Sequence, residues 1–128
     1  MSGAVLVVED DLDLASLIQM ILADDGYEVA LASDGRQALA QVAERMPGVI
    51  LLDMRMPVMN GWEFAREYQA RYGSAAAPIV VVTAAENARA RAEEIGADGW
   101  LEKPFEIEDV LRMVARFVGL VDAGATAP

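Results

Sequence analysis

Five short apolar runs alternate with five longer segments of helical periodicity, and this alternation constrains the fold more than any other feature. The apolar runs cover residues 4–8, 27–31, 49–52, 79–83 and 99–102. Apolar side chains recur at helical spacing in the segments 14–22, 34–46, 61–72, 87–95 and 107–118. This repeated pattern predicts an α/β fold, a doubly wound parallel sheet with helices on both faces and right-handed crossovers.

The chain is long enough for one domain with a sizeable core. It has 128 residues and shows no internal repeat. Residues 1–118 contain every expected strand and helix. Residues 119–128 contain several alanines and glycines, and they are expected to form a flexible tail or the start of a linker. Segment 87–95 has the weakest apolar face, so it is a candidate moving part.

The composition argues against several classes of function. A formal net charge of -11 disfavours binding to nucleic acid or to an anionic membrane, since both require a basic patch. Disulfides, thiolate metal sites and a histidine base are excluded because the chain has no cysteine and no histidine. No apolar stretch approaches the roughly 20 residues of a membrane span, and no signal peptide is visible. A cytoplasmic protein is expected.

Acidic residues follow two of the apolar runs. Asp53 comes directly after run 49–52, and Glu9 and Asp10 come directly after run 4–8. The carboxyl ends of parallel strands share one edge of a sheet, where open α/β folds bind their ligands. These acids should therefore converge, and they can stay ionised together only if a cation neutralises them. Oxygen ligands without histidine or cysteine favour a hard ion such as Mg²⁺.

A hydroxyl and a lysine are expected at the same edge. Thr83 ends the fourth run, and Lys103-Pro104 follows the fifth. A cis Lys103–Pro104 bond is one way to aim the lysine, although only about 5–6% of X-Pro bonds in folded proteins are cis. A carboxylate nucleophile, a metal-binding acid pair, a hydroxyl donor and a lysine together indicate a phosphoryl-transfer site.

Five motifs now make the chain resemble the receiver domain of two-component response regulators. In order, they are VVEDD at 7–11, LLDMRMP at 51–57, NG at 60–61, VTA at 82–84 and KPF at 103–105. Their order and separations match the family from residue 4 to about residue 118. The resemblance implies a CheY-like, flavodoxin-like fold of five parallel strands in the order 2-1-3-4-5, with five helices.

The resemblance also implies a phosphoacceptor and a metal site. Asp53 would accept the phosphoryl group. Asp10 and Asp53, with the backbone carbonyl of Arg55, would bind Mg²⁺ directly, and Mn²⁺ is an alternative ion. Glu9 would act through a metal-bound water or adjust the site. The side chain of Arg55 would overhang the acyl phosphate and control the access of water.

Further roles follow from the resemblance for residues of the last two strands. Thr83 would donate to a phosphoryl oxygen, joined by the backbone N–H of Ala84, and Lys103 would pair with the phosphoryl group. Ala85 falls at a second position that modulates hydrolysis. Trp100 falls at the aromatic switch position, where tyrosine or phenylalanine is more usual. Because its ring is larger, a full inward rotation beside Thr83 is not expected.

The function implied is a signalling switch that accepts a phosphoryl group from a histidine kinase or a histidine phosphotransfer protein. The domain would be a phosphoacceptor with intrinsic autophosphorylation and autodephosphorylation rather than a conventional enzyme. An unidentified downstream protein would bind segment 87–95 and the fifth strand. The domain would be a monomer or a phosphorylation-dependent dimer, without nucleic-acid or membrane contacts of its own. Alternatives are a fragment of a longer transcription regulator or output enzyme, and a Mg²⁺-dependent small-molecule phosphatase.

Overall fold

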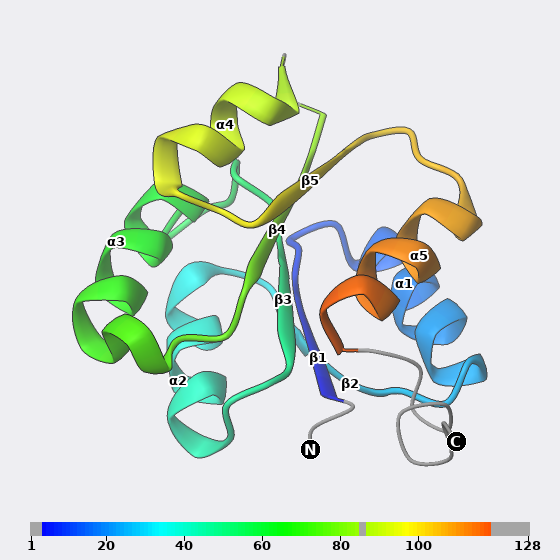
Figure 1. Ribbon diagram of the computed structural model, residues 1–128, viewed down its shortest axis with the longest axis horizontal. Coiled ribbons are helices and arrows are strands. Elements are labelled where there is room, and N and C mark those ends of the chain that lie inside the picture. The colour runs from blue at the N-terminus through cyan, green and yellow to red at the C-terminus, as the bar shows by residue number, and fades with distance from the viewer. Residues whose placement is uncertain (1–3, 85–86, 119–128) are drawn as a thin grey trace.

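The computed structural model describes residues 4–84 and 87–118, and within them five parallel strands form one sheet (Figure 1). The strands are β1 (Ala4–Val8), β2 (Glu28–Ala32), β3 (Val49–Leu52), β4 (Ile79–Thr83) and β5 (Gly99–Glu102). The helices are α1 (Leu12–Asp24), α2 (Gly35–Glu44), α3 (Gly61–Tyr72), α4 (Ala88–Ile95) and α5 (Ile107–Val118), with a short 3₁₀ turn, η1 (Gly73–Ala75). The sheet order is β2-β1-β3-β4-β5. The predicted fold is therefore confirmed.

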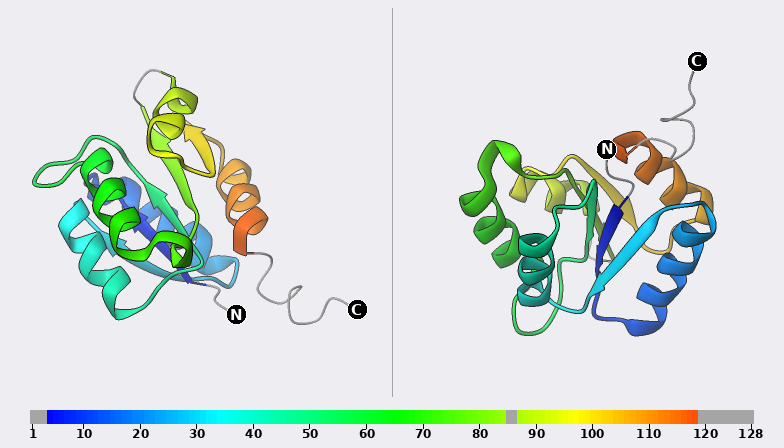
Figure 2. Two further views of the ribbon diagram at one scale, coloured as in Figure 1. Left: turned by 60° about the vertical axis from the view of Figure 1, so that its left-hand side comes forward. Right: turned by 90° about the horizontal axis from the view of Figure 1, so that it is seen from below.

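Helices cover both faces of the sheet. Helices α1 and α5 lie on one face, and α2, α3 and α4 lie on the other (Figures 1 and 2). Successive residues of β1 belong to two separate apolar clusters: Leu6 and Val8 pack under α2 and α3, whereas Val5 and Val7 pack under α1 and α5. This double burial explains why the central strands are continuous apolar runs rather than alternating ones.

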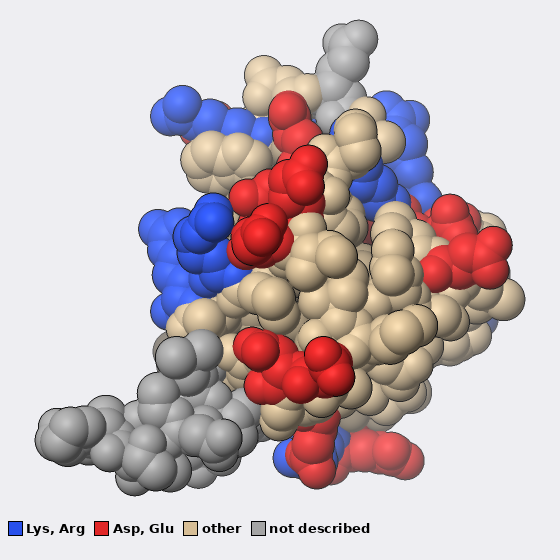
Figure 3. Space-filling view, turned by 90° about the vertical axis from the view of Figure 1, so that its right-hand side faces the viewer, with Lys and Arg blue, Asp and Glu red and all other residues tan. Residues whose placement is uncertain are grey.

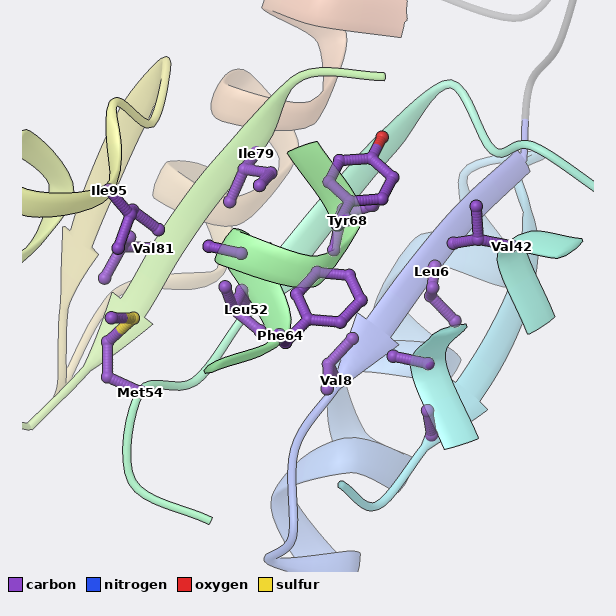
Figure 4. Close-up of a cluster of buried hydrophobic side chains, with 14 of the residues drawn as sticks. Leu6, Val8, Val42, Leu52, Met54, Phe64, Tyr68, Ile79, Val81 and Ile95 are labelled. Atoms are coloured by element: carbon purple, nitrogen blue, oxygen red, sulfur yellow. The ribbon is translucent and has the colours of Figure 1, made fainter. Parts of the chain in front are cut away.

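The larger cluster includes the aromatic face of α3 (Figure 4). Phe64 and Tyr68 are fully buried and stack with ring centroids 5.2 Å apart. The Tyr68 hydroxyl donates to the carbonyl oxygen of Ala77 at 2.9 Å, which satisfies the one polar group that this ring carries into the core. Burial raises the pKa of Tyr68 to about 12. The packing holds α3, and with it the loop that leaves β3, against the sheet.

Several element boundaries differ from the sequence prediction by one or two residues: α1, β2, α2 and α4 were expected at 14–22, 27–31, 34–46 and 87–95. The second strand begins at Glu28 rather than Tyr27, because the Tyr27 backbone N–H instead donates to Leu22 at the end of α1 (3.1 Å). Helix α4 begins at Ala88, and Asn87 caps it by accepting from the Ala90 N–H at 3.1 Å. The predicted tail, residues 119–128, lies outside the described residues. None of the described helices is long and apolar enough to cross a membrane.

Candidate functional site

Strand register places Glu9 and Asp53 side by side. Val8 pairs with Leu52 across β1 and β3, so the next residue of each strand lies at the same level of the sheet edge. The Asp53 backbone N–H extends this ladder by donating to the Val8 carbonyl at 2.9 Å. Both acids are buried, with 3% of Glu9 and 6% of Asp53 exposed. The two side chains that the sequence placed at one edge are therefore neighbours.

Asp10 completes an acidic cluster with Glu9 and Asp53. One carboxylate oxygen from each of the three residues lies within 4.8 Å of the others. Asp10 is exposed, so the cluster is closed by protein on one side and open to water on the other. This donor set of oxygens, partly accessible to water, fits Mg²⁺, which keeps several of its waters when it binds to one or two carboxylates.

Lys103 is the only lysine of the chain, and its ammonium lies against the cluster. Its Nζ donates to Glu9 Oε1 at 2.8 Å and lies 3.8 Å from Asp53 Oδ2. The backbone also fixes the position of Lys103: its N–H donates to the Thr83 carbonyl at 3.1 Å, and the Lys103–Pro104 bond is cis. The lysine is thus held at the edge that the sequence predicted for it.

Burial governs the protonation of the two enclosed acids. It raises the pKa of Glu9 from 4.5 to about 7, against the opposing effect of the Lys103 hydrogen bond. It also raises the pKa of Asp53, although Lys103, Glu9 and the backbone N–H of Arg55 each favour the ionised form. The sequence led us to expect an ionised Asp53 because a metal and Lys103 would offset its charge. Lys103 without a metal offsets only part of the cost of burial.

Of the remaining predicted residues, Thr83 and Ala84 lie at the carboxyl end of β4 and Arg55 lies in the loop after β3. Thr83 ends β4 with 1% of its surface exposed, and Ala84, which follows it, is exposed. The backbone N–H of Arg55 hydrogen-bonds Asp53, and the exposed Arg55 side chain forms no ion pair within residues 4–84 and 87–118. Ala85 lies outside the described residues. The chemical roles assigned to these residues remain predictions.

Trp100 is partly exposed at the surface of β5. It pairs with Val81 in the sheet, its surface is 42% exposed, and the Arg89 guanidinium lies 5.7 Å from the centre of its ring. This contact lies within the range of a cation–π interaction. Trp100 therefore connects β5 with α4 at the surface.

The sequence reasoning missed how the loop after Asp53 is fixed. The Gly61 N–H donates to the Met54 carbonyl at 2.9 Å, and a Cβ on Gly61 would lie 2.7 Å from the Met54 Cα. Only glycine allows this close approach. Asn60 and Glu63 form a reciprocal capping box at the start of α3. The Asn-x-x-Glu pattern was a readable signal for that cap, whereas the glycine contact is visible only in the structure.

Sequence comparison places the chain among response regulators. A sequence profile described as the response regulator receiver domain matches residues 5–115. The DNA-binding response regulator MtrA of Mycobacterium tuberculosis (strain ATCC 25618 / H37Rv) is 36% identical over 116 residues, which cover 89% of this chain and 50% of MtrA. The response regulator MprA of Mycolicibacterium vanbaalenii is 38% identical over 109 residues, 84% of this chain and 46% of MprA. The chain spans about half the length of these relatives.

Solved structures agree with this placement. The chemotaxis protein CheY4 of Vibrio cholerae superposes with a TM-score of 0.81 at 34% identity, covering 91% of this chain and 99% of CheY4. The receiver domain of the sensor histidine kinase PA1611 of Pseudomonas aeruginosa PAO1 gives a TM-score of 0.82 at 30% identity, covering 93% and 99%. That receiver domain holds a magnesium ion in its active-site cleft. The strand order, the acidic edge and the matching profile agree, and the chain belongs to the response regulator receiver domain family of two-component signalling.

Proposed function

We propose that this domain is a phosphoacceptor switch that takes a phosphoryl group from a phosphohistidine donor onto Asp53. One observation carries the proposal: the Asp53 carboxylate lies within 4.8 Å of two further carboxylates and 3.8 Å from the only lysine of the chain. A lone buried carboxylate would protonate and lose its nucleophilicity. The surrounding acids and lysine form a site in which a bound cation would restore the charged form.

The transfer step is a displacement at phosphorus. An oxygen of Asp53 forms the new O–P bond of an acyl phosphate as the P–N bond to the donor histidine breaks. The histidine nitrogen keeps the electron pair of the broken P–N bond. The imidazole then leaves as a neutral ring, or its nitrogen takes a proton from water. Such reactions require positioning and charge neutralisation more than covalent help from the protein.

The proposed binding site for Mg²⁺ or Mn²⁺ consists of Glu9, Asp10, Asp53 and the backbone carbonyl of Arg55. A bound divalent ion would neutralise charge on the phosphoryl oxygens. Glu9 would act through a metal-bound water or tune the site. The family likeness to a receiver domain with magnesium in its cleft supports this assignment.

Four residues are proposed to respond to the phosphoryl group. Lys103 would move from Glu9 toward the new charge, and the Thr83 hydroxyl and the Ala84 N–H would donate to phosphoryl oxygens. Trp100 would then repack. The domain would later lose its phosphoryl group to water, partly by its own catalysis, at a rate tuned by Arg55 and Ala85.

The partners follow from the family. A histidine kinase or a histidine phosphotransfer protein would be the donor, and a downstream protein or output domain would bind α4 and β5. We place the domain in the cytoplasm, at residues 1–118 with a linker or tail at 119–128, as a monomer or a phosphorylation-dependent dimer. The net charge of -11 supports output through protein contacts rather than through nucleic-acid binding by this domain.

Acetyl phosphate with Mg²⁺ tests the acceptor. Intact-mass spectrometry should detect one added phosphoryl group on the wild type and none on Asp53→Asn, which preserves size and removes the nucleophile. Asp13→Asn is the matched control, because Asp13 is an exposed acid of α1 outside the cluster, and it should be labelled like the wild type. Labelling that persists in Asp53→Asn would overturn the assignment. Turnover of p-nitrophenyl phosphate would instead favour a small-molecule phosphatase.

A further inference from the structure

The loop that joins β3 to α3 carries the backbone carbonyl of Arg55, a proposed ligand of the metal. Two hydrogen bonds fix this loop from within. The Gly61 N–H donates to the Met54 carbonyl at 2.9 Å, and it closes the loop at its two ends. The Met59 N–H donates to the Pro57 carbonyl at 2.7 Å. Both bonds join residues that are close in the sequence, so neither ties the loop to the rest of the domain.

A third hydrogen bond comes from the first turn of α2. The Gly35 N–H donates to the Met59 carbonyl at 2.9 Å. The first four N–H groups of a helix have no partner within the helix, and the partial positive charge at that end favours an acceptor. The Met59 carbonyl is such an acceptor, so a helix from an earlier part of the chain holds the loop after Asp53.

The start of α2 is itself held in place by hydrogen bonds. Asp34 Oδ1 accepts from the Gln37 N–H at 2.9 Å, and Gln37 Oε1 accepts from the Ser33 N–H at 3.0 Å. Gly35 and Asp34 are both buried. These contacts fix the direction in which the Gly35 N–H points, and the loop therefore rests on a well-defined support.

The approach of Met59 to α2 leaves no room for a side chain at position 35. A Cβ on Gly35 would lie 2.6 Å from Met59 Cγ and 2.9 Å from the Met59 carbonyl oxygen. The Met59 side chain could rotate away, but its carbonyl can move only with the loop backbone. Gly35 does not have a positive φ, so its own conformation does not require glycine. The close contact with Met59 does.

A shift of Met59 would reach the metal site. Met59 is four positions after Arg55, and the Arg55 N–H hydrogen-bonds the Asp53 side chain. The carbonyl of Arg55 lies between these two fixed points. Mg²⁺ requires nearly ideal octahedral geometry, and a ligand must be held to within about 0.5 Å of its productive position. A displacement of a few tenths of an ångström at Met59 is therefore enough to affect binding.

We propose that Gly35, in the first turn of α2, positions the Arg55 carbonyl for the divalent cation through its hydrogen bond to Met59. This inference rests on the proposed metal site. Gly35 is a positioning residue: its only proposed route to the cation is through Met59 and the loop. The affinity for the metal is then set in part by a helix that contributes no ligand.

Gly35→Ala tests the proposal by isothermal titration calorimetry with Mg²⁺. The dissociation constant should rise about tenfold, because residues that support metal ligands typically change metal affinity by 10- to 100-fold. The urea midpoint in EDTA should change little, since the higher helix propensity of alanine offsets part of the clash. Gly99→Ala is the matched control. A Cβ there would lie 3.2 Å from the flexible end of Met113, at the start of β5, and Mg²⁺ affinity should match that of the wild type.

A second substitution separates the side-chain contact from the backbone contact. Met59→Ala alone keeps the carbonyl that accepts from Gly35, and it should bind Mg²⁺ like the wild type. Combined with Gly35→Ala, it removes the nearest clashing atom and should recover part of the lost affinity. Recovery should be incomplete, because the contact with the Met59 carbonyl oxygen remains.

Amide hydrogen exchange tests the same coupling in the unaltered protein. Coupling between two sites is reciprocal, so Mg²⁺ should slow exchange of the Gly35 amide by about the same factor of ten. The Arg45 amide, at the other end of α2, donates to the Gln41 carbonyl and serves as the control. Its exchange rate should not respond to Mg²⁺.

Equal Mg²⁺ affinity in the wild type and in Gly35→Ala would overturn the inference. If the variant binds weakly because it is partly unfolded, its urea midpoint will fall. The wild-type Gly35 amide then decides, and an exchange rate unchanged by Mg²⁺ would overturn the inference. A wild type that binds no Mg²⁺ would overturn the proposed metal site itself, so calorimetry on the wild type distinguishes the two failures.

Discussion

Lys103 contacts Glu9 more closely than Asp53: its ammonium donates to Glu9 Oε1 at 2.8 Å. The ion pair joins residues 94 positions apart in the chain, and Glu9 is almost fully buried in it. Acidic side chains elsewhere on the domain are arranged differently. Over the α1 and α5 face they form separate clusters around a broad uncharged area (Figure 3). If Asp53 accepts a phosphoryl group as proposed, Lys103 would have to leave Glu9 to pair with it.

Glu9 should make the metal-free domain less stable as the pH rises. Its pKa is raised by burial from 4.5 to about 7, so the stabilisation is complete below pH 4.5 and is lost as the pH rises through 7. Between pH 5.5 and 8, the free energy of unfolding should fall by on the order of 1–3 kcal/mol. Urea denaturation in EDTA at several pH values measures this. Because the chain has no histidine, no histidine titration contributes to the change in stability over this pH range.

Glu9→Gln is the control for this pH dependence, because an amide of the same shape cannot titrate. Its stability should vary less over the same range. The raised pKa of Asp53 also lowers stability as the pH rises, so Glu9→Gln should keep a smaller dependence of stability on pH. A wild type whose stability rises from pH 5.5 to pH 8 in EDTA would contradict the assignment.

Mg²⁺ should stabilise the domain most at high pH. The ion competes with protons for the buried carboxylates of Glu9 and Asp53, whose pKa values are raised, so its effect should grow between pH 5.5 and pH 8. At a concentration about 100 times its dissociation constant, it should add about 2.7 kcal/mol to the free energy of unfolding. Thermal denaturation with and without Mg²⁺ measures the effect. Asp10→Asn should remove most of it, whereas Asp13→Asn should retain it.

Lys103→Met should destabilise the metal-free domain mainly at high pH. Removing the ammonium leaves two buried carboxylates without their cation, at a cost of about 2 kcal/mol at pH 8. The cost should be smaller at pH 5.5, where Glu9 is protonated. Arg112→Met is a suitable control, because Arg112 pairs with Asp109 on the exposed face of α5. An equal loss at both pH values would show that Lys103 contributes by packing alone.

Val58→Gly should stabilise the loop after Asp53. Val58 is 71% exposed and has a φ of 66°, and the Met59 N–H donates to the Pro57 carbonyl at 2.7 Å across it, closing a γ-turn. A β-branched residue is strained in this conformation. Glycine relieves this strain but adds conformational entropy to the unfolded chain. The net effect should raise the free energy of unfolding by about 1 kcal/mol. Val58→Ala should lie between the two, and a clearly destabilised glycine variant would refute the strain.

Much of the fold was predictable because apolar periodicity reports burial directly. The runs at 4–8 and 49–52 are buried on both faces, as continuous strands of a parallel sheet must be. The boundaries at Tyr27 and Asn87 were each off by one residue. In both cases a local hydrogen bond, to Leu22 and from Ala90, decided where the element starts, and such bonds compete with periodicity.

The sequence predicted which residues form the site, but not how their side chains are arranged within it. Strand ends placed Glu9, Asp53 and Lys103 at one edge. They did not indicate that Lys103 lies closer to Glu9 than to Asp53, or that Arg55 reaches Asp53 through its backbone. These choices depend on distances of a few ångströms between segments far apart in the chain.

The sequence alone determined the two-sided core and the identity of the acids at the sheet edge, because apolar runs and strand ends are local features. The strand order followed only from the resemblance of the motifs to receiver domains. Only the tertiary structure decided the protonation of Glu9 and Asp53, the exposed position of Trp100 and the attachment of α4. Burial and contact between distant residues set these properties. The charge that Glu9 carries depends on how much water the folded chain leaves around it.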